Sequence, residues 1–369
     1  MKYLKSVAVF FLVVLSFLEI SAQNLKPGFD KAEYKELIYI ATRSTESPEK
    51  AKEIPLPEHS KLLYKSKPMG LDNLWELWLK DGNTAVICTR GTTEKPESWL
   101  ANLYAAMTPA KGELKVSNSE TFKYELSTNE HAAVHTGYLL NTAFLSKDML
   151  PRIDSCYKAG IKNFIIMGHS QGGGISYLLT AHFYNLQSKG ILPADIRFKT
   201  YCSAAPKPGN LYFAYDYERK TQNGWAYNVV SAADWVPQTP FSVEMPEDLP
   251  IVSPIPLVEE TIKQQTLFKR MFLNMVYGKL TNPSRKTVKT YQKLLGTEIA
   301  KKVKDYLPEF VAPQFYNSNN YVRTGNTIVL YPNPNDTVYY EKFPNNSKDL
   351  MIHHSFPPYL YLLNQLEYN

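Results

Sequence analysis

The sequence contains one serine whose neighbours are typical of a catalytic nucleophile. A short apolar run at 164–167 is followed by Gly-His-Ser-Gln-Gly at 168–172, and a helix-competent stretch extends from about 175 to 186. A strand, Gly-x-Ser-x-Gly and a helix in this order form a nucleophile elbow, a strained turn that holds a serine hydroxyl out of the backbone. The glycines leave room for strand and helix to approach closely. We therefore predict that Ser170 is the nucleophile of an acyl-transfer reaction.

A serine hydroxyl is a weak nucleophile and needs a neighbouring base, which is most often histidine. In hydrolases that use this elbow, the acid and then the histidine follow the serine along the chain. Three histidines lie beyond Ser170. His182 lies about three turns further along the elbow helix, roughly 18 Å along its axis, and is too far away. The residues themselves leave His353 and His354 as candidates.

The base in turn needs a carboxylate that orients its ring. Asp234 is the preferred candidate, because it follows a predicted strand at 226–231 and precedes Val236 and Pro237. Asp216 is the second candidate, but it lies in a helix-like tract. We expect the carboxylate to come from Asp234.

An ester hydrolase also needs hydrogen-bond donors for the oxyanion. One donor is expected to be the backbone N–H of Gln171, the residue after the nucleophile. The second should come from a turn that follows an earlier central strand, and Arg90-Gly91-Thr92 follows the apolar run at 84–89. This places the backbone N–H of Thr92, and its hydroxyl, beside the predicted oxyanion.

The pattern of elements predicts an α/β fold with a largely parallel sheet. Helices are expected near 28–43, 97–107, 137–159 and 175–186, and apolar strands near 61–66, 73–79, 84–89, 163–167, 197–203, 226–231 and 321–330. Strands that alternate with helices in this way form parallel sheets covered by helices. The polar segment 108–133 has no clear period and is predicted to be a long surface loop or flap. A short helix is expected to end near Leu366.

A Pro-rich linker introduces a segment of different composition at about 242–318. Two helix-like stretches are expected at 258–278 and 284–306, separated by Asn282-Pro283, and residues 257–306 contain eleven Lys and Arg against four Asp and Glu. This insertion could be a basic, amphipathic cap that touches anionic lipid or shields an apolar cleft. The favoured interpretation is an ordinary helical pair packed on the domain with solvated lysines.

Composition limits the remaining possibilities. Of 369 residues, 44% are hydrophobic and 21% charged, and the formal charge is +6, too small to indicate nucleic-acid binding. Residues 1–22 have a basic start, an apolar run and a small-residue cleavage site, which is typical of an export signal. We expect a secreted or periplasmic protein with one domain at 23–369. Cys88, Cys156 and Cys202 are expected to be buried free thiols, and no spacing indicates a metal site.

Together these segments resemble the class 3 lipase family, the fungal-type secreted triacylglycerol lipases and their relatives. The matching segments are, in chain order, 88–92 (oxyanion strand and turn), 97–103 (the following helix), 134–138 (the entry to the helix before the elbow), 168–173 (the elbow), 204–210 (a Pro- and Gly-containing turn), 229–237 (the acid segment) and 354–359 (His-Ser with Tyr359). The resemblance covers about 60–240 and 320–365. It favours His354 over His353 as the base.

The chain also departs from the family pattern. Gln171 replaces the usual Leu, which retains the backbone donor and is expected to put a polar side chain at the pocket floor. Ala205 replaces part of a Gly-rich turn, and the interval between Asp234 and His354 is long. The insertion therefore lies outside the pattern, and the sequence does not identify which segment forms a lid.

The resemblance implies an α/β-hydrolase fold and a secreted serine ester hydrolase, with lipid esters as the expected substrates. Ser170, Asp234 and His354 would form the triad, and Thr92 and Gln171 the oxyanion hole. No cofactor, metal or stable protein partner is expected. A feruloyl- or acetyl-type esterase on polysaccharides is an alternative compatible with 26 Tyr residues, and a catalytically inactive binding protein with this fold is a third.

Overall fold

The computed structural model describes residues 25–250, 252–346 and 348–367. The predicted export signal at 1–22 lies outside these residues. Within them, the central sheet has seven strands in the order β1 (Ser60–Lys65), β2 (Trp75–Lys80), β3 (Thr84–Thr89), β8 (Asn163–His169), β9 (Arg197–Ser203), β11 (Ala226–Ser231) and β13 (Asn326–Leu330). β3, β8, β9, β11 and β13 are parallel, whereas β1–β2 and β2–β3 are antiparallel. The predicted α/β fold with a mostly parallel sheet is confirmed.

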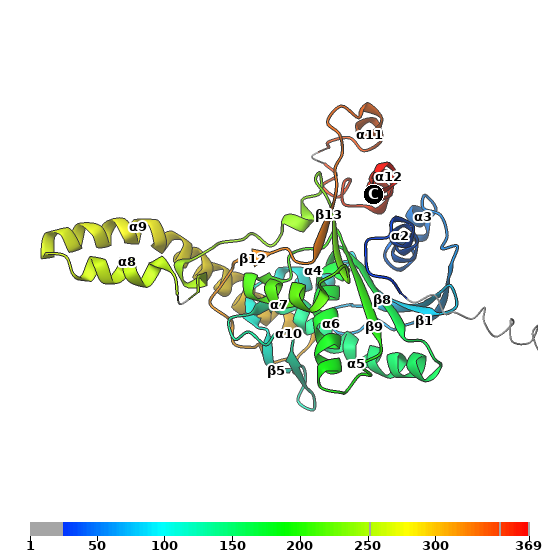
Figure 1. The fold of residues 1–369 in the computed structure, drawn as a ribbon, viewed down its shortest axis with the longest axis horizontal. Coiled ribbons are helices and arrows are strands. Elements are labelled where there is room, and N and C mark those ends of the chain that lie inside the picture. Colours follow the sequence, from blue (N-terminus) through cyan, green and yellow to red (C-terminus); the bar gives the residue numbers. More distant parts are fainter. Residues whose placement is uncertain (1–24, 251, 347, 368–369) are drawn as a thin grey trace, which may run out of the picture.

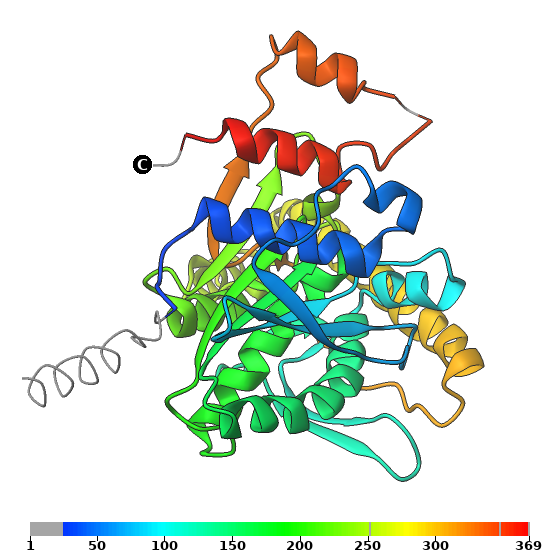
Figure 2. The same cartoon turned by 90° about the vertical axis from the view of Figure 1, so that its right-hand side faces the viewer.

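The apolar central strands are buried on both faces because helices cover both sides of the sheet. Along β8, Phe164 and Ile166 pack in one core cluster, and Ile165 and Met167 pack in the other. The first cluster includes side chains of α5 (Thr136–Lys158) and α6 (Gln171–Ser188), and the second those of α2 (Lys31–Thr45) and α12 (Phe356–Gln365). Figure 2 shows α2 and α12 together on one face of the sheet, with α5 and α6 on the opposite face.

The shorter elements connect these layers. They are α3 (Pro48–Ala51), α4 (Pro96–Leu103), α7 (Leu211–Thr221), η1 (Val236–Gln238), η2 (Pro246–Asp248) and α11 (Thr337–Lys342). The helices expected near the N-terminus, before the elbow and after it are present with boundaries shifted by a few residues, and the C-terminal helix is α12. The three cysteines are buried free thiols, as predicted.

The prediction of a long loop at 108–133 is wrong. The segment contains β4 (Met107–Pro109), β5 (Lys111–Lys115) and β6 (Thr121–Glu125), and β5 and β6 form an antiparallel hairpin. β4 joins a second sheet in the order β12 (Tyr321–Val322), β10 (Gly209–Asn210), β7 (Ala133–His135), β4. The hairpin strands are mostly exposed, so each provides only one fully buried side chain, Leu114 or Tyr124, and no apolar period is visible in the sequence.

The strand expected as one run at 321–330 is divided between two sheets. β12 belongs to the second sheet and β13 to the central sheet, and Gly325 between them has φ +85°. This backbone conformation is accessible to glycine without strain. It allows the chain to change direction within a continuous β-like pattern.

The insertion forms two helices that project from the body. α8 (Pro254–Lys263) and α9 (Leu267–Tyr291) lie side by side and point away from the central sheet (Figure 1). The predicted break at Asn282-Pro283 is wrong, because α9 continues through Pro283 and the chain reverses at 264–266 instead. The chain then returns through the π-helical η3 (Gln292–Glu298) and α10 (Ile299–Tyr306), which packs against α4. The favoured expectation of a helical pair packed on the domain therefore does not describe α8 and the first half of α9.

Candidate active site

Ser170 lies in a strained turn between β8 and α6. Its φ is 58° and its ψ is −131°, a combination that is costly for a residue with a side chain and is found mainly at functional sites. Its N–H donates to Ser203 O at 2.9 Å, and its carbonyl accepts from Gly173 N at 2.9 Å. The side chain is partly exposed. The turn therefore holds the Ser170 hydroxyl at the carboxyl end of the central strands.

The elbow glycines are required by close backbone packing. A Cβ on Gly168 would lie 2.2 Å from the Gly172 carbonyl carbon, and a Cβ on Gly172 would lie 2.2 Å from Thr89 O. Contacts this short are impossible for real atoms, so β8, the start of α6 and β3 can approach in this way only without side chains. The sequence interpretation of this motif agrees with the geometry.

Asp234 and His354 form a buried hydrogen-bonded pair. His354 Nδ1 lies 2.7 Å from Asp234 Oδ2, and the two side chains are 10% and 0% exposed. Asp234 Oδ1 accepts from Val236 N at 2.9 Å, and Oδ2 also accepts from the Tyr359 hydroxyl at 2.8 Å. Because the carboxylate is fixed by these donors, it holds the imidazole with its proton on Nδ1.

The other ring nitrogen of His354 is left available for proton transfer. His354 Nε2 is buried and has no hydrogen-bond partner among the described residues. Buried polar atoms are nearly always satisfied, and exceptions often mark catalytic groups. With Nδ1 protonated, Nε2 carries the lone pair that can accept a proton from a hydroxyl.

His169 links the elbow to the loop that carries His354. Its Nε2 donates to His354 O at 2.8 Å, so its Nδ1 accepts from Ser203 Oγ at 2.9 Å. The His169 and His354 ring centroids are 5.0 Å apart. Burial, followed by the neighbouring His354 ring, holds the pKa of His169 well below its usual value. His169 is therefore a neutral core histidine whose hydrogen bonds join Ser203 to the backbone of His354.

The predicted oxyanion turn lies beside the elbow. A Cβ on Gly91 would lie 3.2 Å from His169 O and 3.6 Å from Ser170 Cβ. No acceptor within the described ranges is in hydrogen-bonding position to the Thr92 N–H. Gln171 is the first residue of α6, and the N–H of such a residue has no intrahelical acceptor. Gln171 is therefore next to Ser170 in the chain and Thr92 follows the residue packed against it, and neither N–H has an acceptor among the described residues.

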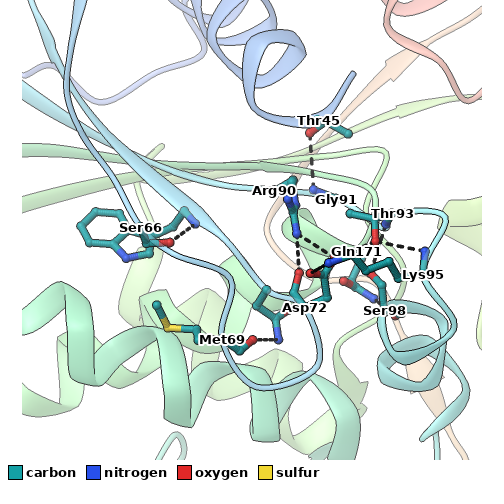
Figure 3. Close-up of polar contacts among 12 residues, drawn as sticks. Thr45, Ser66, Met69, Asp72, Arg90, Gly91, Thr93, Lys95, Ser98 and Gln171 are labelled. Atoms are coloured by element: carbon teal, nitrogen blue, oxygen red, sulfur yellow. Dashed lines mark hydrogen bonds and ion pairs between the residues drawn. The ribbon is translucent and has the colours of Figure 1, made fainter. Parts of the chain in front are cut away.

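The side chains of Thr92 and Gln171 are tied together by Asn102 of α4. Asn102 Nδ2 donates to Thr92 Oγ1 at 2.9 Å, and Asn102 Oδ1 accepts from Gln171 Nε2 at 3.0 Å. Gln171 Nε2 also donates to Ser98 O at 2.8 Å, and the residue is 1% exposed. The expectation that this side chain forms the pocket floor is therefore wrong, since it points into α4 (Figure 3).

A buried carboxylate that the sequence analysis did not identify organises the start of the oxyanion turn. Asp72 accepts from Thr93 Oγ1 at 2.8 Å and pairs with Arg90 and Lys95, as Figure 3 shows. Burial opposes its ionisation, but the hydrogen bonds from Lys95 and Thr93 and the Arg90 charge outweigh burial and lower the pKa of Asp72. No motif marks Asp72, because its partners lie 18 to 23 residues away.

The remaining candidates have other partners. Asp216 pairs with Arg219 at 2.6 Å and Lys220 at 2.8 Å. His353 contacts the Tyr339 hydroxyl and Asn345 Oδ1, each at 2.9 Å. The Asp216 alternative therefore has no contact with the candidate site.

Two buried histidines also lie outside the proton-transfer path. His135 caps α5 by accepting from Tyr138 N at 3.4 Å, and burial lowers its pKa to about 3. His182 is buried in α6 against Phe122. In the described ranges, no group of three or more His, Cys, Asp and Glu residues could hold a metal ion. No helix in these ranges is long and apolar enough to cross a membrane.

Comparison with known proteins agrees with this geometry. The family model described as lipase (class 3) matches residues 86–244, which contain the oxyanion turn, the elbow and Asp234. The matched segment, which is less than half of the chain, is similar to the class 3 lipase family. The candidate base, His354, lies beyond the matched segment. No protein with curated annotation matches the sequence.

Several fungal lipase structures resemble the chain. The native Rhizomucor miehei lipase propeptide complex is 18% identical with a TM-score of 0.40, and the match covers 58% of this chain and 66% of that one. Lipase II from Rhizopus niveus is 20% identical with a TM-score of 0.41, covering 57% and 75%. The lipase from Rhizopus microsporus var. chinensis is 21% identical with a TM-score of 0.39, covering 60% and 75%. The chain thus spans slightly less than two thirds of the first of these structures.

Proposed function

We propose that this protein is an exported serine carboxylic-ester hydrolase whose substrates are lipid esters. The observation that carries the proposal is the buried Asp234–His354 pair, in which His354 Nε2 has no partner among the described residues. The loop that carries His354 is hydrogen-bonded to His169, the residue before the strained Ser170 turn. The similarity of residues 86–244 to the class 3 lipase family supports the same chemistry. Export rests on the composition of residues 1–22.

In the proposed reaction, the Ser170 hydroxyl attacks the ester carbonyl while His354 Nε2 accepts its proton. Asp234 stabilises the imidazolium that forms, and the same histidine then gives the proton to the leaving alcohol. A water molecule then attacks the acyl group on Ser170, with His354 again as the base, and releases the carboxylic acid and the free serine. The N–H groups of Thr92 and Gln171 stabilise the oxyanion, each contributing about 3 kcal/mol to the transition state.

Apolar side chains around the candidate site favour acyl chains over sugar esters. Trp99 and Leu103 of α4 are 42% and 46% exposed, and Trp235, next to Asp234, is 42% exposed. Phe241, a few residues further on, is 74% exposed. Exposed aromatic and aliphatic groups on the elements that carry the site are suited to hydrocarbon chains.

The test is hydrolysis of p-nitrophenyl esters of increasing acyl length by protein that lacks residues 1–22. We expect activity that Ser170→Ala abolishes, with a preference for longer chains over acetate. Equal rates for the two proteins would refute the assignment of Ser170. A preference for acetyl or feruloyl esters would support the polysaccharide esterase instead.

A further inference from the structure

The two helices that project from the body, α8 and α9, expose an unusual number of large apolar side chains. We define these helices, residues 254–291, as the arm. All residues of the arm are described, and its exposed apolar side chains are Leu257, Val258, Leu267, Phe268, Met271, Phe272, Met275, Val276 and Leu280, which are 38% to 84% exposed. Contiguous exposed apolar surfaces on soluble proteins usually mark a binding face.

The exposed side chains of α9 gather on one side of the helix. Phe268, Met271, Phe272 and Met275 are spaced by one, three and four residues, which places them on one helical face. The opposite side of the helix faces α8, where Tyr277 donates to Glu259 Oε1 at 3.0 Å. α9 therefore uses a polar contact to hold α8, and its apolar face has no partner among the residues that the structure describes.

The base of the arm is firmly attached to the body. Val288 is fully buried, and Gln292 Nε2 donates to Tyr316 O at 2.7 Å. Ala106 N donates to Leu295 O at 3.2 Å, directly after α4. The elements that follow the arm, η3 and α10, therefore contact Ala106 and α4, and α4 carries Asn102 of the candidate site.

The charge of the arm indicates what kind of partner its apolar face could bind. Lys263, Lys269, Arg270 and Lys279 of the arm are exposed, and residues 257–306 carry eleven basic and four acidic side chains. Apolar anchors bordered by lysine and arginine complement an anionic lipid surface, where the apolar face enters the acyl boundary and the cations meet the headgroups. Neither helix of the arm is long and apolar enough to cross a membrane.

We propose that the arm docks the protein on anionic lipid surfaces by inserting its Phe268–Met275 face into the interface. This binding goes beyond hydrolysis and does not depend on the proposed chemistry. Delivery of lipid substrate to Ser170 by the docked arm rests on the proposed function. The two statements are tested separately.

The experiment measures co-sedimentation of residues 23–369 carrying Ser170→Ala with phosphatidylcholine vesicles, with and without phosphatidylglycerol. We expect binding that requires phosphatidylglycerol and weakens with added salt. Phe268→Ser combined with Phe272→Ser should weaken it about tenfold or more, because each buried Phe contributes a large apolar area. Ile191→Ser, at an apolar residue that is 62% exposed outside the arm, is the matched control and should change nothing.

Three results would overturn the proposal. The first is equal vesicle binding by the Phe268→Ser/Phe272→Ser protein and its parent, and the second is no binding by the parent. The third is self-association that the same double variant abolishes while vesicles are not bound, which would make the face a contact between copies. With Ser170 restored, the double variant should hydrolyse soluble p-nitrophenyl butyrate normally, which shows that it is folded and separates failure of docking from failure of the hydrolase assignment.

Discussion

Tyr359→Phe removes a single buried hydroxyl that supports the acid of the candidate triad. This hydroxyl donates to Asp234 Oδ2 at 2.8 Å and accepts from Ser231 N at 3.0 Å, and the residue is fully buried. A hydrogen bond to a charged group contributes about 1.5–3 kcal/mol, and leaving a buried N–H unsatisfied costs about 1–3 kcal/mol. We therefore expect the free energy of unfolding to fall by about 2.5–6 kcal/mol.

The same substitution should also slow catalysis, because among the described residues Asp234 Oδ2 then keeps His354 alone as a donor and orients the ring less well. We expect kcat to fall about tenfold, equivalent to about 1.4 kcal/mol in the activation barrier, with KM little changed. Urea denaturation gives the stability, and p-nitrophenyl butyrate hydrolysis gives kcat and KM.

Tyr361→Phe is the matched control, because it also removes a tyrosine hydroxyl from α12, two residues further along the chain. Its hydroxyl contacts Asp336 at 3.3 Å near the surface. We expect this variant to be close to the parent in both assays. If the two Tyr→Phe variants had the same stability and the same kcat, the reasoning about buried support of Asp234 would be wrong.

Three further predictions concern other parts of the fold. Asn102→Ala should lower kcat about tenfold by releasing Thr92, whereas Asn102→Asp should retain most activity because its carboxylate can accept from the Thr92 hydroxyl; equal kcat for both variants would contradict this role. Gly172→Ala should destabilise the protein by at least about 3 kcal/mol in urea denaturation, because its Cβ would lie 2.2 Å from a backbone oxygen of β3, whereas Gly278→Ala in α9 should be tolerated. Burial and then the Lys189 charge lower the pKa of His182 to about 4 from 6.5, so the unfolded chain binds more protons between these values and stability falls as pH falls through that window. His182→Phe should reduce this slope by up to about 1.4 kcal/mol per pH unit, and an unchanged slope in denaturation at several pH values would count against it.

The sequence was most informative where function depends on local backbone geometry and chain order. The elbow could be predicted because Gly168 and Gly172 have no steric alternative. Asp234 could be preferred because it follows a strand. The choice of His354 over His353 came from the family resemblance, and the structure places His354 Nδ1 against Asp234.

Features that depend on distant contacts could not be predicted. Asp72 supports the oxyanion turn through residues far along the chain, and the Gln171 side chain is buried against α4 because Ser98 and Asn102 offer hydrogen bonds. The hairpin at 111–125 has too few buried side chains to show an apolar period. The projection of α8 and α9 could not be predicted, because it depends on whether the body packs against their apolar side chains. Their sequence pattern alone suits a packed helical pair equally well.

The most direct test of the proposed triad is labelling with a fluorophosphonate, followed by mass spectrometry of the labelled peptide. This reagent reacts with a serine only when a neighbouring base activates the hydroxyl. We expect one labelled site, Ser170, with labelling lost in Ser170→Ala and strongly slowed in His354→Ala. Labelling of a different residue, or an unchanged rate in His354→Ala, would contradict it.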